Sequence, residues 1–398
     1  MITRSIEEEV LEALSYLPAV AIIGPRQVGK TTLVKKLMSK IDKPSVYLDL
    51  EYFADYSKLK TAPDLYFKEH ENDLVILDEI QRMPELFPLL RSIIDQNRQP
   101  FRFLLLGSAS PVLLRQSSET LAGRVLYIEL QGINYQEIYS TIPYQQHWLR
   151  GGFPDALLAP NNKAAEFWFR GFMQTYVERD LPNLGLTASP ELMRNMLRML
   201  TNVQGGMLNY ADLSDSLNIS QPTVKSYIDF LESAFLIRRL KPYFANIGKR
   251  LVKSPKLFFR DTGILHHLMG IQDFEGLQGN IGLGNSWEGY VIQQIVANLK
   301  NDVEPYFYRT KEKAELDLVL VQNTRVKATL EIKYGNAPNI SRGNTVAIDD
   351  LGAKLNLVVT PQADDYWHRT NLRVCSIATV WEYLRDEGLL EERTLPTR

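Results

Sequence analysis

The chain has 398 residues, enough for two or three domains that each bury a core. Its composition, 45% apolar and 23% charged, is that of a globular protein, and a net charge of −2 gives no overall attraction to nucleic acid. The single cysteine, Cys375, excludes an internal disulfide and a cysteine-based zinc cluster, and the five histidines lack metal-ligand spacing.

The N-terminal segment carries Arg4 and several glutamates, which is unlike a signal peptide. No apolar run approaches the ~18 residues that a membrane span requires. We therefore expect a cytoplasmic protein with no membrane partner. Residues 5–17 repeat apolar side chains with a helical period and predict a short helix, which Pro18 ends.

Residues 19–23 form a continuous apolar run, typical of a strand buried on both faces. The sequence G-P-R-Q-V-G-K-T follows directly at residues 24–31, and a helical pattern comes next. This strand–loop–helix context identifies a P-loop, whose backbone N–H groups and helix N-terminus bind phosphates. Lys30 would supply charge to the β- and γ-phosphates, and the Thr31 hydroxyl would bind Mg²⁺. The residues expected to bind ATP are Gly24, Pro25, Arg26, Gln27, Val28, Gly29, Lys30, Thr31 and Thr32.

A second buried strand, at residues 74–77, ends in Asp78 and Glu79. In a P-loop enzyme the aspartate lies near the metal, and the following glutamate can orient or deprotonate the attacking water. Ser108 follows another apolar strand; it is a candidate for contacting the γ-phosphate and equally a candidate helix cap. Predicted strands alternate with helices, which indicates an α/β fold with a parallel sheet; the other strands are 46–50, 102–106 and 125–130.

These segments resemble the AAA+ superfamily, and more closely the prokaryotic ATPases whose AAA domain opens with G-P-R-Q-V-G-K-T. The likeness covers essentially the whole chain and includes L-D-E-I-Q-R at 77–82, L-A-G-R at 121–124 and Y-V-E-R-D at 176–180. It implies an AAA+ P-loop core over residues 1–132, in which one strand separates the P-loop strand from the strand ending in Asp78. It also implies a helical lid over residues 133–190.

The same resemblance implies that an arginine contacts the γ-phosphate. Arg124 and Arg179 are the candidates, and either could instead form an ordinary ion pair. Spacing does not show whether the arginine acts within one chain or across a homo-oligomer.

A helix-turn-helix pattern occupies the middle of the chain, with a short helix at 210–217, a turn at 218–220 and a longer helix at 221–235. Ser220 can cap the longer helix. Helix pairs of this kind read the DNA major groove or serve as plain packing modules. The first turns of the longer helix carry hydrogen-bonding side chains suited to base edges, namely Gln221, Thr223, Lys225 and Ser226.

Residues 238–260 contain no acidic side chain, and aromatic residues interleave with the basic ones. Such a stretch is where DNA phosphate contacts are expected, and a solvated charged face is the alternative. The resemblance to the AAA ATPases implies a winged helix over residues 191–255. The eight basic residues are Arg238, Arg239, Lys241, Lys249, Arg250, Lys253, Lys256 and Arg260.

The last segment, residues 256–398, combines a helix carrying Glu288 with a strand carrying Asp317 and a further strand leading into Glu331 and Lys333. Residues 331 and 333 share a strand face because side chains alternate. Glu288, Asp317 and Glu331 could hold Mg²⁺, and Lys333 could position or deprotonate a water. Glu315 lies on the same face as Asp317 and competes as a ligand.

An acid on one strand followed by E-x-K on the next resembles the PD-(D/E)xK nucleases, which implies an α/β restriction-endonuclease-like domain. Leu316 stands where that family often has proline. Our leading hypothesis is an ATP-hydrolysing AAA+ protein that acts on DNA, with a nuclease-like domain under nucleotide control. The alternatives are a nucleotide-switched DNA-binding regulator with an inactive nuclease fold, and an ATPase that scaffolds another protein.

Overall fold

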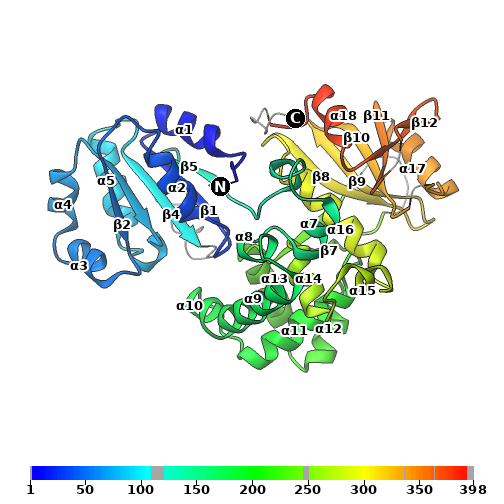
Figure 1. The fold of residues 1–398 in the computed structure, drawn as a ribbon, viewed down its shortest axis with the longest axis horizontal. Helices are drawn as coiled ribbons and strands as arrows, with labels where there is room; N and C mark the ends of the chain where they lie inside the picture. The colour runs from blue at the N-terminus through cyan, green and yellow to red at the C-terminus, as the bar shows by residue number, and fades with distance from the viewer. Residues whose placement is uncertain (1, 109–120, 245–250, 336, 363, 392–398) are drawn as a thin grey trace.

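The computed structural model describes residues 2–108, 121–244, 251–335, 337–362 and 364–391. Two sheets lie on either side of a group of helices (Figure 1). The blue and cyan sheet comes from the N-terminal third, and the yellow to red strands of the other sheet come from the C-terminal third. Within the described ranges, no helix is both long enough and apolar enough to traverse a bilayer.

The N-terminal sheet has five parallel strands in the order β2-β3-β4-β1-β5. The P-loop strand β1 is therefore separated from β3, the strand ending in Asp78, by β4, as the resemblance to AAA+ proteins implies. The five strands are β1 (Ala19–Gly24), β2 (Ser45–Asp49), β3 (Leu74–Asp78), β4 (Phe103–Ser108) and β5 (Val125–Glu129).

Helices cover both faces of this sheet because the strands are apolar on both sides. Val20 and Ile22 of β1 share a core with the helices on one face, while Ala21 and Ile23 join the core on the other. The first face carries α1 (Glu7–Tyr16) and α2 (Lys30–Met38), and the second carries α3 (Phe53–Thr61), α4 (Pro63–Glu69), the 3₁₀ turn η1 (Ile80–Arg82) and α5 (Leu86–Gln96).

The middle of the molecule is helical and contains the helix pair that the sequence predicts at residues 210–235. Ser220 caps α13 by accepting a hydrogen bond from the Thr223 N–H, and Asn218 makes the preceding turn in a left-handed conformation. The elements are η2 (Tyr135–Glu137), α7 (Tyr144–Arg150), α8 (Pro154–Leu157), α9 (Asn162–Thr175), the π-helical turn η3 (Tyr176–Asp180), α10 (Leu181–Asn183), α11 (Pro190–Asn202), α12 (Tyr210–Leu217), α13 (Gln221–Ser233), α14 (Thr262–Leu268) and α15 (Phe274–Gln278).

The C-terminal sheet has eight strands in the order β12-β13-β11-β10-β9-β8-β6-β7. Helices α16 (Leu283–Val296) and α18 (Val380–Asp386) share a core with one face, and α17 (Arg342–Leu351) with the other. The strands are β6 (Ile237–Pro242), β7 (Lys256–Phe259), β8 (Val303–Arg309), β9 (Glu315–Gln322), β10 (Arg325–Ile332), β11 (Leu355–Thr360), β12 (Tyr366–Arg369) and β13 (Leu372–Ser376).

The domain boundary predicted between residues 255 and 256 has to move. Strands β6 and β7 form one antiparallel pair, with Leu240 opposite Lys256, so this boundary would separate two paired strands. Strand β6 also pairs in parallel with β8, where Lys241 lies opposite Tyr306. The local apolar pattern could not reveal that β6 belongs to the C-terminal sheet, because the β6–β8 pairing joins residues far apart in the chain.

Candidate functional site

The P-loop follows β1 and wraps around the N-terminus of α2. Gly24 has φ 155°, and a Cβ there would lie 2.1 Å from the backbone oxygen of Leu130, so only glycine fits. Gly29 has φ 94° and immediately precedes Lys30, the first residue of α2. The two glycines of the motif therefore stand where the backbone requires them.

Lys30 lies against its own loop. Its ammonium donates to the backbone oxygens of Gly24 and Pro25, at 2.9 and 2.8 Å. Burial lowers the pKa of Lys30 to about 8, although the nearby Glu79 and Asp78 carboxylates act in the opposite direction. A phosphate that reached this ammonium would find a buried cation with little competing solvent.

Asp78 joins the P-loop to the neighbouring strands. Its Oδ2 atom accepts hydrogen bonds from the Thr31 hydroxyl at 2.7 Å and from the Tyr47 hydroxyl at 2.6 Å. Its other oxygen accepts the N–H of Glu79 at 2.9 Å. Residues 24–31 and 74–79 are thus in direct contact, and Thr31 and Asp78 offer the hard oxygen ligands that Mg²⁺ prefers. Burial, followed by the hydrogen bond to Asp78, raises the pKa of Tyr47.

Glu79 is held at the end of β3 in a left-handed conformation, with φ 55°. The Ser108 hydroxyl at the end of β4 lies 3.1 and 3.0 Å from its two carboxylate oxygens. Ser108 therefore contacts Glu79. Whether it also caps a helix depends on residues 109–120, which lie outside the described part of the chain.

A cavity of about 410 Å³ opens beside the P-loop, within the range of small-molecule sites. The N-terminal segment and α8 form its other walls. Its lining residues are Ile2, Arg4, Glu7, Gln27, Val28, Gly29, Lys30, Thr31, Thr32, Leu33, Lys36, Glu79, Ile133, Pro154, Asp155 and Leu158. The cavity and the Thr31–Asp78 oxygen pair together fit a nucleotide with Mg²⁺.

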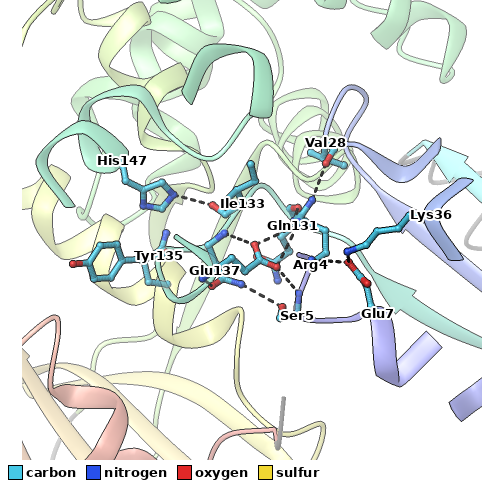
Figure 2. A network of polar contacts seen from close by, with 12 residues as sticks. Arg4, Ser5, Glu7, Val28, Lys36, Gln131, Ile133, Tyr135, Glu137 and His147 are labelled. Carbon is cyan, nitrogen blue, oxygen red and sulfur yellow. Dashed lines mark hydrogen bonds and ion pairs between the residues drawn. The ribbon is translucent and has the colours of Figure 1, made fainter. Parts of the chain in front are cut away.

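Arg4 connects this cavity to the helical part of the molecule (Figure 2). Its guanidinium donates to the backbone oxygen of Val28 at 2.9 Å, to the backbone oxygen of Gln131 at 2.6 Å, and to Glu137 at 3.2 Å. Glu137 also accepts the Ser5 N–H at 2.6 Å. Apart from its charge, nothing in the local sequence points to Arg4, because its partners Val28, Gln131 and Glu137 are distant in the chain.

Arg26 of the P-loop lies away from the cavity lining. It forms ion pairs with Asp180, at 2.5 Å, and with Glu51. Asp180 also accepts a hydrogen bond from the predicted γ-phosphate arginine Arg179, at 3.1 Å, and the Arg179 side chain is 65% exposed. Asp180 therefore links Arg179 to Arg26 of the P-loop, because it contacts both arginines.

Arg124 cannot contact the γ-phosphate of its own chain. Strands β1 and β5 run parallel with Ala19 opposite Val125, so Arg124 lies where the strands begin, whereas the P-loop follows their other end. Its guanidinium pairs instead with Asp95, at 2.6 and 2.8 Å. Sequence alone could not exclude Arg124 as the γ-phosphate contact, because the exclusion depends on the register between β1 and β5.

A second group of charged side chains lies at the C-terminal sheet. Lys256 of β7 contacts Glu288 of α16 at 2.9 Å, Glu315 of β9 at 3.0 Å and Asp317 of β9 at 3.4 Å. The other Asp317 oxygen accepts the Ile332 N–H at 2.9 Å. We call Glu288, Glu315, Asp317 and Glu331 the C-terminal carboxylate cluster.

Glu331 and Lys333 pair with each other at the edge of this cluster, at 2.5 Å. The second oxygen of Glu331 is buried without a hydrogen-bond partner among the described residues. Burial, followed by the Asp317 charge, raises the pKa values of Glu331 and Glu288 to about 8.

The predicted metal ligands Glu288, Asp317 and Glu331 do not fit a divalent ion in this arrangement. Across the described residues, no group of three or more histidine, cysteine, aspartate or glutamate side chains is arranged to hold one. The Lys256 ammonium contacts Glu288 and Asp317 itself. By composition Lys256 falls in the basic stretch, yet it opens the apolar run K-L-F-F, and a lysine in that position can indicate a buried cation that needs acidic partners.

The basic stretch does not form an exposed basic surface where it is described. Arg239 pairs with Asp229 and Glu232, and Arg260 pairs with Glu129. Burial lowers the pKa of Arg238 to about 10. Lys241 and Lys253 are exposed, while Lys249 and Arg250 lie outside the described residues. DNA binding stays a prediction, and it has to rest mainly on α13, where Gln221, Lys225 and Ser226 are exposed and Thr223 is half-buried.

Comparison with known proteins divides the chain into three regions. Residues 17–139 match a family described as an AAA domain, residues 142–275 match a domain of unknown function (DUF8612), and residues 283–380 match another (DUF4143). The Walker-type ATPase PABY2304 of Pyrococcus abyssi is 15% identical and superimposes with a TM-score of 0.44, over 68% of this chain and 96% of that chain.

Two relatives match nearly the full length. They are the uncharacterized proteins Rv2008c of Mycobacterium tuberculosis and Mb2031c of Mycobacterium bovis, each 39% identical over 389 residues, which is 98% of this chain and 86% of theirs. The chain belongs to the same family as these mycobacterial proteins, and its N-terminal third is a P-loop ATPase domain of the AAA type.

Proposed function

We propose that this protein binds ATP with Mg²⁺ and hydrolyses it. The observation that carries the proposal is the direct contact between Thr31 and Asp78, next to a cavity that both Lys30 and Thr31 line. The P-loop amides and the Lys30 ammonium bind the phosphates, and Thr31 and Asp78 hold the metal. Bound Mg²⁺ supplies positive charge to the β- and γ-phosphate oxygens.

Glu79 is the proposed general base. It follows the strand that ends in Asp78, and Ser108 donates to its carboxylate, which restricts the orientation of the side chain. A carboxylate held this way accepts a proton from the attacking water without having to reorganise.

The test compares Lys30→Ala, Glu79→Gln and the surface control Lys68→Ala. Lys30→Ala should abolish ATP binding, and Glu79→Gln should bind ATP while losing at least about 100-fold in kcat. Lys68 is an exposed residue of α4, and its variant should match the wild type. Unchanged ATP affinity in Lys30→Ala, or steady turnover in Glu79→Gln, would contradict these assignments.

We propose DNA as the partner, bound through α12 and α13. The element order α11-α12-α13-β6-β7 supports a winged helix, and the Ser220-capped N-terminus of α13 presents Gln221, Lys225 and Ser226 to solvent. The order α16-β8-β9-β10-α17-β11 similarly supports a nuclease-like C-terminal domain. A homo-oligomer, in which Arg124 could reach the nucleotide of a neighbouring chain, is part of the same proposal.

A salt titration of duplex DNA binding tests the DNA proposal. Lys225→Ala should weaken binding and reduce the slope of log K against log salt by about 1, whereas Lys163→Ala, an exposed lysine on α9, should leave both unchanged. Absence of DNA affinity at low ionic strength would favour the scaffold alternative.

A further inference from the structure

The Lys256 ammonium lies at the centre of the C-terminal carboxylate cluster. Lys256 is 3% exposed, and its Nζ atom contacts carboxylates from α16 and β9 at 2.9, 3.0 and 3.4 Å. An ammonium has three N–H donors, and here three carboxylates surround it. The ring of Phe307 lies 5.6 Å from the same nitrogen and covers another side of it.

The backbone fixes the position of this ammonium. Lys256 lies opposite Leu240 in the β6–β7 pair and forms a bridge with Met207 on its other side. The next residues of β7, Leu257 and Phe258, are buried in the core. Removing the ammonium from the cluster would therefore require either a strand shift or the burial of an uncompensated lysine elsewhere.

The spacing of the carboxylates suits an ammonium better than a metal ion. Mg²⁺ binds oxygen at about 2.1 Å, whereas the oxygens around Nζ lie at 2.9 to 3.4 Å. Both oxygens of Asp317 are already used, one by Lys256 and one by the Ile332 N–H. A divalent ion would have to displace the ammonium and draw in carboxylates that come from a helix and a strand.

We propose that Lys256 replaces the divalent cation of a nuclease-like site, so that the C-terminal domain of this protein is held together by an internal ammonium and does not cleave nucleic acid by metal-ion chemistry. The inference rests on the contacts of Lys256 and not on the proposed ATPase activity.

The experiment measures Mn²⁺ binding to the full chain without nucleotide, by electron paramagnetic resonance. Lys256→Met removes the charge while keeping an unbranched side chain, and Lys253→Met, on the exposed part of the same segment, is the matched control. Asp317→Asn, made in the wild type and in Lys256→Met, identifies binding at the cluster. Melting temperatures with and without Mn²⁺ provide a second readout, because a bound ion stabilises the folded state.

Wild type and Lys253→Met should show no Mn²⁺ binding that Asp317→Asn removes. Lys256→Met should gain one Mn²⁺ site that the wild type lacks, and Mn²⁺ should raise the melting temperature of this variant. Asp317→Asn should abolish both gains. A wild-type Mn²⁺ site that Asp317→Asn removes overturns the proposal even if Lys256→Met does not fold, and a folded Lys256→Met that binds no Mn²⁺ overturns it as well.

Discussion

Lys30 is a buried cation whose present partners are neutral backbone oxygens. Burial disfavours its charged form, and this lowers its pKa to about 8. A bound triphosphate would favour the charged form and would raise the pKa again, so nucleotide binding and proton uptake at Lys30 are linked.

The affinity for ATP should therefore depend on pH. Below about pH 8 Lys30 already carries its proton and affinity should be constant. Above that pH, the free protein has to take up a proton before it binds, so the Kd should rise by up to about tenfold per pH unit. Calorimetric titration between pH 7 and 9, in buffers of different ionisation enthalpy, measures both the affinity and the proton uptake. A flat affinity over this range would contradict the linkage.

Among single residues, those of the P-loop and the acids at 78 and 79 could be identified from the sequence, because both groups are contiguous motifs with a known structural context. It could not identify Tyr47 as a partner of Asp78, since that contact depends on β2 and β3 being neighbours. For the same reason, Lys256 appeared as one more basic residue until its acidic partners on α16 and β9 were known.

Among the elements, the N-terminal segment is tied to η2 by a buried ion pair. The side chains of Arg4 and Glu137 are 10% and 2% exposed, and the same guanidinium supports the P-loop at Val28. Removing one partner of such a pair leaves an uncompensated buried charge.

Arg4→Met should consequently destabilise the protein by about 3–5 kcal/mol. Arg170→Met is the control, because Arg170 forms an exposed pair with Glu166 within α9 and such pairs contribute about 0–1 kcal/mol. Urea unfolding of the two variants gives the comparison. Equal losses of unfolding free energy in the two variants would show that the buried Arg4–Glu137 pair contributes no more to stability than an exposed pair.

Elements defined by local signals could be predicted from the sequence, and elements defined by distant pairing could not. The helix pair α12 and α13 begins and ends close to the predicted residues because the Ser220 cap and the apolar period are local. The strands β6 and β7 were not predicted, because their partners include a strand some sixty residues away. The basic stretch was likewise recognised from its local composition, but the sequence could not show that Arg239 and Arg260 pair with acidic residues on other elements.

In the whole molecule, α7, α14 and α16 join the helical part to the C-terminal sheet through buried polar contacts. Ser286 of α16 accepts a hydrogen bond from the Trp148 indole at 3.0 Å and lies 2.7 Å from His266 Nε2. His147 lies 2.9 Å from the Tyr290 hydroxyl and 2.8 Å from the Ile133 backbone oxygen. Burial lowers the pKa of both histidines to about 4, so the folded protein keeps them neutral.

These histidines should make the protein sensitive to acid. Their folded pKa of about 4 lies below the unfolded value of about 6.5, so the unfolded chain binds more protons between these pH values and stability falls as pH falls through this window. Glu288 and Glu331, with pKa values near 8, act in the opposite direction, so the informative quantity is a difference between variants.

Unfolding of wild type and of the double variant His147→Gln/His266→Gln should be measured at pH 5 and pH 7. The variant should be less stable at pH 7, and it should lose less stability than the wild type on going to pH 5. Parallel losses in the two proteins would show that neither histidine controls acid unfolding.

The continuous sheet formed by β6, β7 and β8 has a practical consequence for anyone who divides this protein into fragments. A polypeptide started at residue 256 would leave behind β6, which lies between β7 and β8, and would expose the unpaired edge of β8 to neighbouring copies. Such a fragment would self-associate, whereas one started ahead of α11 would retain its missing strand and remain dispersed.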